Sequence, residues 1–209
     1  HKSVSLFVVD NNTPGITIRP LINIVGLHSF NEVFFDNVRV PVRNLIGQEN
    51  MGFYYLMTAL DFERLMVGIG TFKRGLEQLV AYVRQTERDN VPLGRSHDVR
   101  KQLAEIAVRI DVAYLFFWRT ASMLDKGHVP SVESSALKLV TTELSRKMAD
   151  VGMEILGPDG LLTEGAQGAP MNGLVPRGYL DCISATIGAG TSEIQRNIIA
   201  MRGLGLPAK

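Results

Sequence analysis

Residues 97–126 read HDVRKQLAEIAVRIDVAYLFFWRTASMLDK, and this stretch decides the fold. Its apolar side chains recur at the spacing of an α-helix and form one stripe: Leu103, Ile106, Ile110, Ala113, Phe117 and Leu124. The pattern predicts a long amphipathic helix that buries one face against other helices.

Two further stretches, residues 50–87 and 132–156, have the same periodicity. Asn90–Gly94 and Gly127–Ser131 contain proline and glycine and interrupt the helical pattern. Long helices joined by short links lie antiparallel, which predicts a mainly α protein with an up-and-down four-helix bundle. Gly157–Gly173 is rich in glycine and is expected to be a loop. Two shorter helices are predicted after it, at about residues 175–186 and 191–202.

The first 47 residues have the pattern of β-structure. The strand candidates are Val4–Val9, Ile16–Arg19, Glu32–Phe35 and Val38–Val40. Because an ordinary sheet has more strands than this, residues 1–47 are interpreted as the C-terminal half of a β domain. Residues 48–209 are then the helical domain. We also expect a natural N-terminal part to precede His1.

Composition narrows the class of protein. Hydrophobic residues make up 45% of the chain and charged residues 21%, which is typical of a globular protein. The net charge of +1 does not favour nucleic-acid binding. The single cysteine, Cys182, excludes an internal disulfide and indicates a reducing compartment; we interpret it as a small apolar residue in a packed helix. The four histidines have no metal-ligand spacing, so no metal site is expected.

A turn of small residues precedes the last predicted helix. Residues 187–196 read IGAGTSEIQR. Glycine and alanine permit close approach of a ligand to the backbone, and a helix start presents free N–H groups that suit an anion. The turn itself contains no carboxylate.

With Leu60–Leu65, this turn makes the chain resemble the C-terminal part of a flavin-dependent acyl-CoA dehydrogenase. Five strings occur in the family's order and spacing: Thr13–Ile16, Phe34–Pro41, Leu45–Phe53, Glu154–Gly160 and Gly190–Arg196. The resemblance covers nearly the whole chain and implies a partial β domain followed by the C-terminal helical bundle.

The resemblance implies α,β-dehydrogenation of an acyl-CoA thioester, in which a carboxylate removes the α proton and FAD accepts the β hydride. Many members carry that glutamate at the position of Ala189. A smaller branch, which includes isovaleryl-type dehydrogenases, has alanine there and carries the base at the position of Glu63. Glu63 is therefore the predicted catalytic base, and an exposed helix carboxylate beside Arg64 is the alternative.

The substrate residues also come from the resemblance. The backbone N–H of Ala189 is expected to bind the thioester oxygen, with Gly190 in the same turn. Asp61, Phe62 and Arg64 are expected near the CoA portion, whereas a surface ion pair is the alternative for Asp61 and Arg64. Gly188 replaces a bulky aromatic residue, which indicates a wide pocket for branched acyl groups or an unusual backbone angle.

The implied cofactor is FAD. The resemblance assigns its adenylate part to Thr191, Ser192 and Glu193, where capping of the helix by Thr191 is a compatible structural role. A neighbouring subunit is expected to contribute Glu154, Leu156, Gly157 and Arg88 to the flavin. The chain departs from the family at residues 154 and 158 and does not match the family's clamp at Thr86–Asn90, where Arg88 is the one cation available for the flavin of a neighbouring subunit.

The resemblance further implies a homo- or hetero-tetramer, an electron-transfer flavoprotein or similar acceptor, and the bacterial cytoplasm or mitochondrial matrix. We expect this chain alone to bind FAD poorly and to be inactive. The rival interpretations are an acyl-CoA oxidase or flavin monooxygenase on the same fold, a non-catalytic subunit of a mixed oligomer, and a purely structural bundle. No apolar run has the roughly 20 residues that a membrane span needs.

Overall fold

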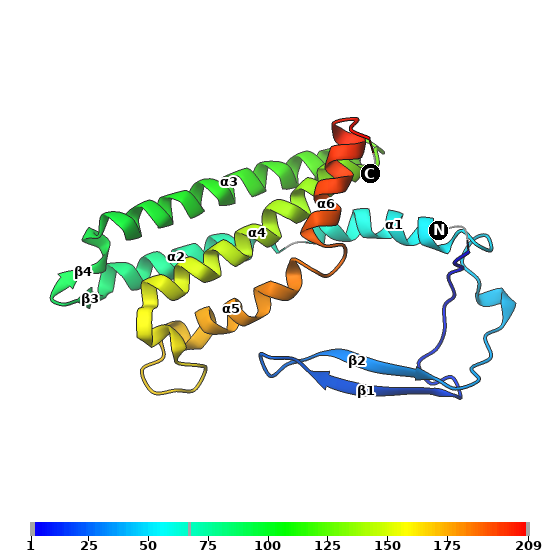
Figure 1. The fold of residues 1–209 in the computed structure, drawn as a ribbon, viewed down its shortest axis with the longest axis horizontal. Helices are drawn as coiled ribbons and strands as arrows, with labels where there is room; N and C mark the ends of the chain where they lie inside the picture. Colours follow the sequence, from blue (N-terminus) through cyan, green and yellow to red (C-terminus); the bar gives the residue numbers. More distant parts are fainter. Residues whose placement is uncertain (1–2, 67, 208–209) are drawn as a thin grey trace. The chain divides into compact units, whose positions relative to one another are not determined.

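Four helices run side by side with alternating direction (Figure 1). The computed structural model describes residues 3–66 and 68–207. The four helices are α2 (Ile69–Gln85), α3 (His97–Asp125), α4 (Ser131–Leu156) and α5 (Leu174–Ala185). Helix α4 packs against each of the other three. This arrangement confirms the predicted mainly α fold with an up-and-down four-helix bundle.

Local signals set where the central helices begin and end. The Ser96 side chain caps α3 by accepting a hydrogen bond from the N–H of Val99. After α3, Gly127 adopts a left-handed φ of 76° and stops the helix. Pro130 then precedes α4, where its ring and missing N–H are tolerated. The predicted ranges 97–126 and 132–156 therefore agree closely with α3 and α4.

The predicted helix 50–87 is wrong as a single element. It consists of α1 (Gly52–Glu63), the 3-10 turn η2 (Arg64–Met66) and α2, and residue 67 lies outside the described residues. Gly68 has a non-helical ψ of 62° and precedes α2. Glycine costs about 1 kcal/mol relative to alanine inside a helix, and both Gly68 and Gly70 lie here. Helical periodicity on both sides concealed this break.

The remaining elements connect and extend the bundle. A short hairpin, β3 (Glu87–Arg88) with β4 (Val91–Pro92), and the 3-10 turn η3 (Leu93–Arg95) link α2 to α3. The predicted loop after α4 contains two 3-10 turns, η4 (Gly157–Leu161) and η5 (Pro170–Gly173). The last predicted helix is α6 (Ser192–Ile198), which continues into a π-helical turn, η6 (Ile199–Gly203).

The chain divides into two compact units, His1–Phe62 and Glu63–Lys209. The first contains the antiparallel pair β1 (Ile16–Ile22) and β2 (His28–Phe35), together with the 3-10 turn η1 (Val42–Asn44). The predicted domain boundary after residue 47 lies inside this unit and stays a prediction. Phe30, Phe34 and Phe35 are exposed on β2, because a hairpin alone cannot bury its apolar side chains.

Two predicted strands are wrong. Val4–Val9 forms only single bridges, from Val4 to Met51 and from Phe7 to Leu45. Val38–Val40 is not a strand either, and it follows Asn37, which has a left-handed φ of 48°. A β-rich composition is not sufficient for a strand, because a strand also needs a continuous partner for its backbone hydrogen bonds.

The core of the second unit lies between α2, α3 and α4. Its fully buried members include Ile106 on α3 and Leu144, Val151 and Leu156 on α4. Burying a side chain of this size stabilises the fold by about 1.5–3 kcal/mol. Among the described residues, no helix is long and apolar enough to cross a membrane. None of their His, Cys, Asp and Glu side chains form a group that could hold a metal ion; His1 lies outside the described residues.

Cys182 is buried in α5, as its packing interpretation requires. Its thiol donates a hydrogen bond to the Tyr179 carbonyl oxygen at 3.2 Å. Burial raises the pKa of the Cys182 thiol, and the nearby Asp150 carboxylate adds to this effect. Because the thiolate is the reactive form, alkylation by iodoacetamide at neutral pH should be at least about tenfold slower in the native protein than after unfolding in urea. Equal alkylation rates in a mass-spectrometric time course would contradict this burial.

Candidate active site

The turn between α5 and α6 has a left-handed backbone. Ala189 has a φ of 53° and Gly190 a φ of 94°. For alanine this conformation costs roughly 1–2 kcal/mol, so the surrounding contacts must stabilise it. The base of the turn is closed by a hydrogen bond from the N–H of Ser192 to the Thr186 carbonyl oxygen at 3.0 Å.

Two buried side chains hold the carbonyl side of this turn. The ammonium of Lys138 on α4 donates to the Gly190 carbonyl oxygen at 2.6 Å. The Gln195 amide donates to the carbonyl oxygens of Gly190 at 3.0 Å and Ala189 at 3.4 Å. Lys138 is 6% exposed and Gln195 is 0% exposed. Two successive peptide carbonyls are therefore tied to the protein interior.

The N–H side of the turn is different. Within the described part of the chain, the N–H groups of Ala189 and Gly190 donate no hydrogen bond. Successive N–H groups beside left-handed residues form a concave site that suits an anion or a carbonyl oxygen. The geometry therefore allows the Ala189 N–H to bind a thioester carbonyl.

Lys138 was not among the residues selected from the sequence. Burial and the Arg64 guanidinium lower the pKa of Lys138, while the Glu193 carboxylate opposes the shift. These effects show that Arg64 on η2 and Glu193 at the start of α6 both lie near Lys138. A lysine within the apolar stripe of α4, beside Leu137, was the available sequence signal.

The predicted residues before α2 have different exposures. Asp61 and Arg64 are each only 6% exposed, so neither side chain lies at the surface. Phe62 and Glu63 are exposed. Asp61 and Phe62 belong to the first compact unit, whereas Glu63 and Arg64 begin the second. The 3-10 turn that contains Arg64 packs against α3 and α4.

Gly188 does not have the unusual backbone that was one of its two interpretations. Its φ is not in the left-handed region, unlike those of Ala189 and Gly190. A Cβ at this position would lie 3.6 Å from the Ser184 carbonyl oxygen, an ordinary contact. The backbone at Gly188 therefore accepts a side chain, and glycine leaves that space empty.

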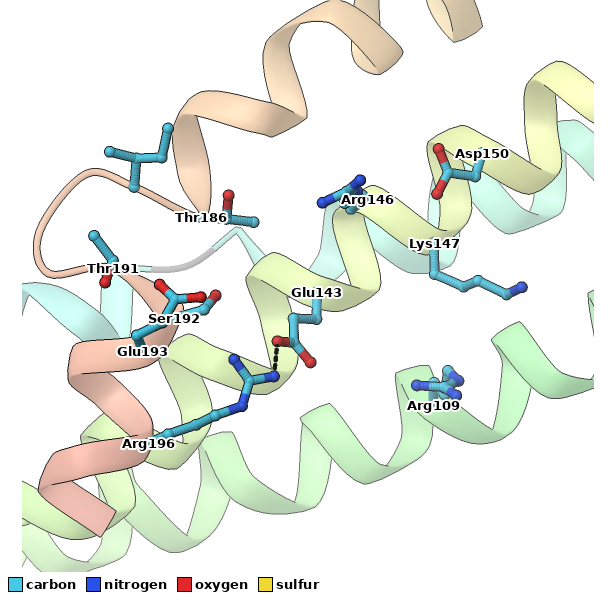
Figure 2. A pocket seen from close by; sticks show the side chains of 11 residues that line it. Arg109, Glu143, Arg146, Lys147, Asp150, Thr186, Thr191, Ser192, Glu193 and Arg196 are labelled. Atoms are coloured by element: carbon cyan, nitrogen blue, oxygen red, sulfur yellow. Dashed lines mark hydrogen bonds and ion pairs between the residues drawn. The ribbon is translucent and has the colours of Figure 1, made fainter. Parts of the chain in front are cut away.

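A cavity of about 470 Å³ lies beside the turn (Figure 2). Thr191, Ser192 and Glu193 line it, as do basic and acidic side chains from three helices: Arg109, Glu143, Arg146, Lys147, Asp150 and Arg196. Figure 2 shows the Arg196 guanidinium paired with the Glu143 carboxylate. Ligand pockets commonly span about 300–1,000 Å³, so this cavity has room for a nucleotide-sized group with negative charge.

The start of α6 has polar groups directed to its own backbone and to this cavity. Thr191 is its N-cap and accepts a hydrogen bond from the N–H of Ile194 at 3.3 Å, which confirms the capping role. The backbone N–H of Glu193 and the Thr191 hydroxyl lower the pKa of the Glu193 carboxyl. Ser192 is buried, and its hydroxyl has no hydrogen-bond partner among the described residues.

The predicted flavin contacts of a neighbouring subunit form a separate cluster at the other end of α4. The Arg88 guanidinium donates to the Ile155 carbonyl oxygen at 2.8 Å, and it lies 3.1 Å from where a Cβ on Gly157 would stand. The Glu154 carboxylate accepts from the Gln102 amide at 2.6 Å. Leu156 is buried in the core, so only its backbone could meet a ligand. This cluster is about 25 Å from Lys138, given the rise of an α-helix.

A family profile and the sequence relatives of this chain all indicate the same protein family. The profile described as "Acyl-CoA dehydrogenase, C-terminal domain" matches residues 50–204. Acyl-CoA dehydrogenase FadE26 of Mycobacterium tuberculosis is 31% identical over 99% of this chain and 53% of its own length. The mitochondrial isovaleryl-CoA dehydrogenase of Oryza sativa subsp. japonica is 30% identical, over 95% of this chain and 48% of its own length.

Solved structures agree with the sequence relatives. The ChsE4-ChsE5 complex from Mycobacterium tuberculosis contains a chain with a TM-score of 0.87 and 31% identity to this one. The match covers 99% of this chain and 53% of that one. The chain thus spans about half the length of the relatives it matches. With the bundle, the turn and the profile match in agreement, the chain belongs to the acyl-CoA dehydrogenase family.

Proposed function

We propose that the full-length protein carrying this chain is an FAD-dependent acyl-CoA dehydrogenase that converts an acyl-CoA thioester to the enoyl-CoA. The observation that carries the proposal is the left-handed turn at Ala189 and Gly190. Its carbonyls are bonded to Lys138 and Gln195, whereas its N–H groups donate no hydrogen bond within the described residues. FAD, when bound, accepts the β hydride.

In this proposal the Ala189 N–H binds the thioester carbonyl oxygen. Negative charge develops on that oxygen as the α proton leaves, and a preorganised donor stabilises the charge where it develops. The proton goes to the Glu63 carboxylate. The α C–H electron pair then forms the new double bond as the β hydride leaves, so that two hydrogens are removed in total.

Two observations favour Glu63 over the other acid near the turn. The turn has no carboxylate of its own, and the first acid after it is Glu193. Its lowered pKa makes the Glu193 carboxylate a weaker base. Glu63 directly precedes Arg64, whose charge acts on Lys138 and thus lies near the turn. Asp61, Phe62 and Arg64 would then lie toward the CoA portion.

The proposed acyl group is branched or bulky. Gly188 has an ordinary φ, yet it carries no side chain beside the proposed thioester site. The missing side chain leaves space next to the carbonyl, and Gly190 permits close approach of the substrate.

The cavity beside the turn fits the adenylate part of FAD. Thr191, Ser192 and Glu193 line it on one side, and cations from α3 and α4 lie across from them. Arg109, Arg146 and Lys147 would attract the phosphates.

We further propose a tetramer, in which Glu154, Leu156, Gly157 and Arg88 approach the flavin of a neighbouring subunit. Arg88 is already bonded to Ile155, which favours a second candidate function, a non-catalytic subunit of a mixed oligomer. The relative from Mycobacterium tuberculosis was solved as a complex of two differently named chains. An electron-transfer flavoprotein is the proposed acceptor, and weak FAD binding by residues 1–209 alone remains our expectation.

The test is anaerobic reduction of the bound flavin in the full-length protein. Branched-chain acyl-CoA thioesters should bleach the oxidised flavin absorbance, with formation of the enoyl-CoA measured by mass spectrometry. Thioethers of the same chains should not bleach it, because they lack the carbonyl that acidifies the α proton. If neither the thioesters nor the thioethers bleach the flavin, the proposed dehydrogenase activity is refuted, and the non-catalytic subunit is favoured. Rapid reoxidation by oxygen after bleaching would identify an oxidase.

A further inference from the structure

Lys138 is buried at a place where a cation is costly. It lies on α4 directly after Leu137, which is fully buried, and is itself only 6% exposed. Removing an ammonium from water is unfavourable unless strong hydrogen bonds and charges compensate. Its described hydrogen bond is the one to the Gly190 carbonyl oxygen, at 2.6 Å. The short contact is typical of a charge-assisted bond.

This contact orients the peptide between Gly190 and Thr191. The N–H and C=O of a trans peptide lie in its plane and point in opposite directions. When the Gly190 carbonyl points at Lys138, the N–H of Thr191 points away from it. When the Ala189 carbonyl points at Gln195, the N–H of Gly190 points away in the same manner. The donors from α4 and α6 thus set the peptide planes that follow Ala189.

Alanine needs such support because its left-handed φ of 53° is unfavourable. Gly190 could take many conformations, since glycine has no Cβ. Without Lys138, the Gly190 carbonyl would keep only the neutral Gln195 amide at 3.0 Å. The turn would then sample other conformations in which the Ala189 N–H has a different direction.

We propose that Lys138 is a positioning residue: its ammonium holds the Gly190 carbonyl and thereby keeps the turn in the left-handed conformation in which the Ala189 N–H can bind the thioester oxygen. This inference rests on the proposed function, because it assigns a thioester to the turn. Lys138 does not touch the substrate and acts through the backbone. Its charge also adds to the positive potential around the oxygen, together with that of Arg64.

The experiment uses the full-length flavoenzyme with three variants. K138M removes the donor and the charge but keeps the volume, K138R keeps both, and K101M changes an exposed lysine on α3 as the control. Each protein is tested with an acyl-CoA thioester and with the matching thioether, which lacks the carbonyl oxygen. The ratio of the two dissociation constants measures how much the carbonyl contact contributes to binding.

K138M is expected to lower kcat about 10- to 100-fold, because small misplacements of a catalytic donor have effects of this size. Its thioether affinity should remain that of the wild type, while the preference for the thioester falls. K138R should recover most of both properties, and K101M should match the wild type. If K138M does not fold with FAD, K138Q provides the neutral variant for the same ratio.

An unchanged affinity ratio in K138M would overturn the inference, as would equal losses of thioester and thioether binding with a lowered unfolding temperature. The latter result would show a purely structural role. If the wild-type flavoenzyme binds no acyl-CoA, the proposed function fails and this inference with it. If the wild type is active and only the K138M prediction fails, the proposed function stands.

Discussion

Replacing Glu63 by glutamine in the full-length flavoenzyme should lower kcat by about 10²- to 10⁴-fold, the range that a general base contributes. Glutamine has nearly the same shape as glutamate but cannot accept the α proton at neutral pH. FAD content and acyl-CoA affinity should remain close to those of the wild type, because neither the turn nor the cavity beside α6 is changed. Stopped-flow reduction of the flavin under anaerobic conditions measures the affected step directly.

Glu77→Gln is the matched control, since Glu77 is an exposed glutamate on α2. It should reduce the flavin at the wild-type rate. Retention of near wild-type flavin reduction by Glu63→Gln would remove Glu63 as the base. An accompanying loss in Glu193→Gln would move the assignment to Glu193, against the expectation from its lowered pKa.

Leu144→Ala should destabilise the bundle by about 2–5 kcal/mol, the usual cost of truncating a buried leucine. Leu144 lies on α4 and is 1% exposed within the core formed with α2 and α3. The substitution removes three carbon atoms from a closely packed interior, and the neighbours can fill the space only in part. Urea unfolding of the full-length protein, followed by the helical circular dichroism signal, gives the free energy.

Leu115→Ala provides the comparison on α3, because Leu115 is 71% exposed. The change should alter the free energy of unfolding by less than about 0.5 kcal/mol in this chain, as for most surface substitutions. Similar midpoints for the two variants would place Leu144 outside the core. A larger effect of Leu115→Ala would indicate that its side chain is buried in an assembly, as the proposed tetramer allows.

Much of the fold was predictable because helical periodicity is a local property. The apolar stripe that includes Ile106 and Ile110 specified α3 nearly to its ends, and α4 followed in the same way. The break between α1 and α2 was not predicted, because the apolar pattern continues across it. The 3-10 turn η2 lies at this break and packs on α3 and α4, and the spacing of apolar residues in the sequence does not indicate that contact.

The candidate site was likewise predictable from the sequence only in part. The small residues of the turn and the absence of a carboxylate at Ala189 were visible in the sequence, and so was the capping threonine. The contact of Lys138 with Gly190 was not, because these residues are distant in the chain and meet only when α4 packs beside α6. The sequence also did not show that the cluster of Arg88, Glu154, Leu156 and Gly157 is separate from the turn. The two lie at opposite ends of α4 in the structure.

The sequence by itself determined most of the helices, their order and the family, because these depend on the spacing of apolar residues and on short ordered strings. Only the tertiary structure decided how the turn is held. Ala189 adopts a strained left-handed conformation because buried donors from two helices fix the carbonyls that follow it. Such support depends on side chains from distant positions converging on one peptide, which local patterns cannot specify.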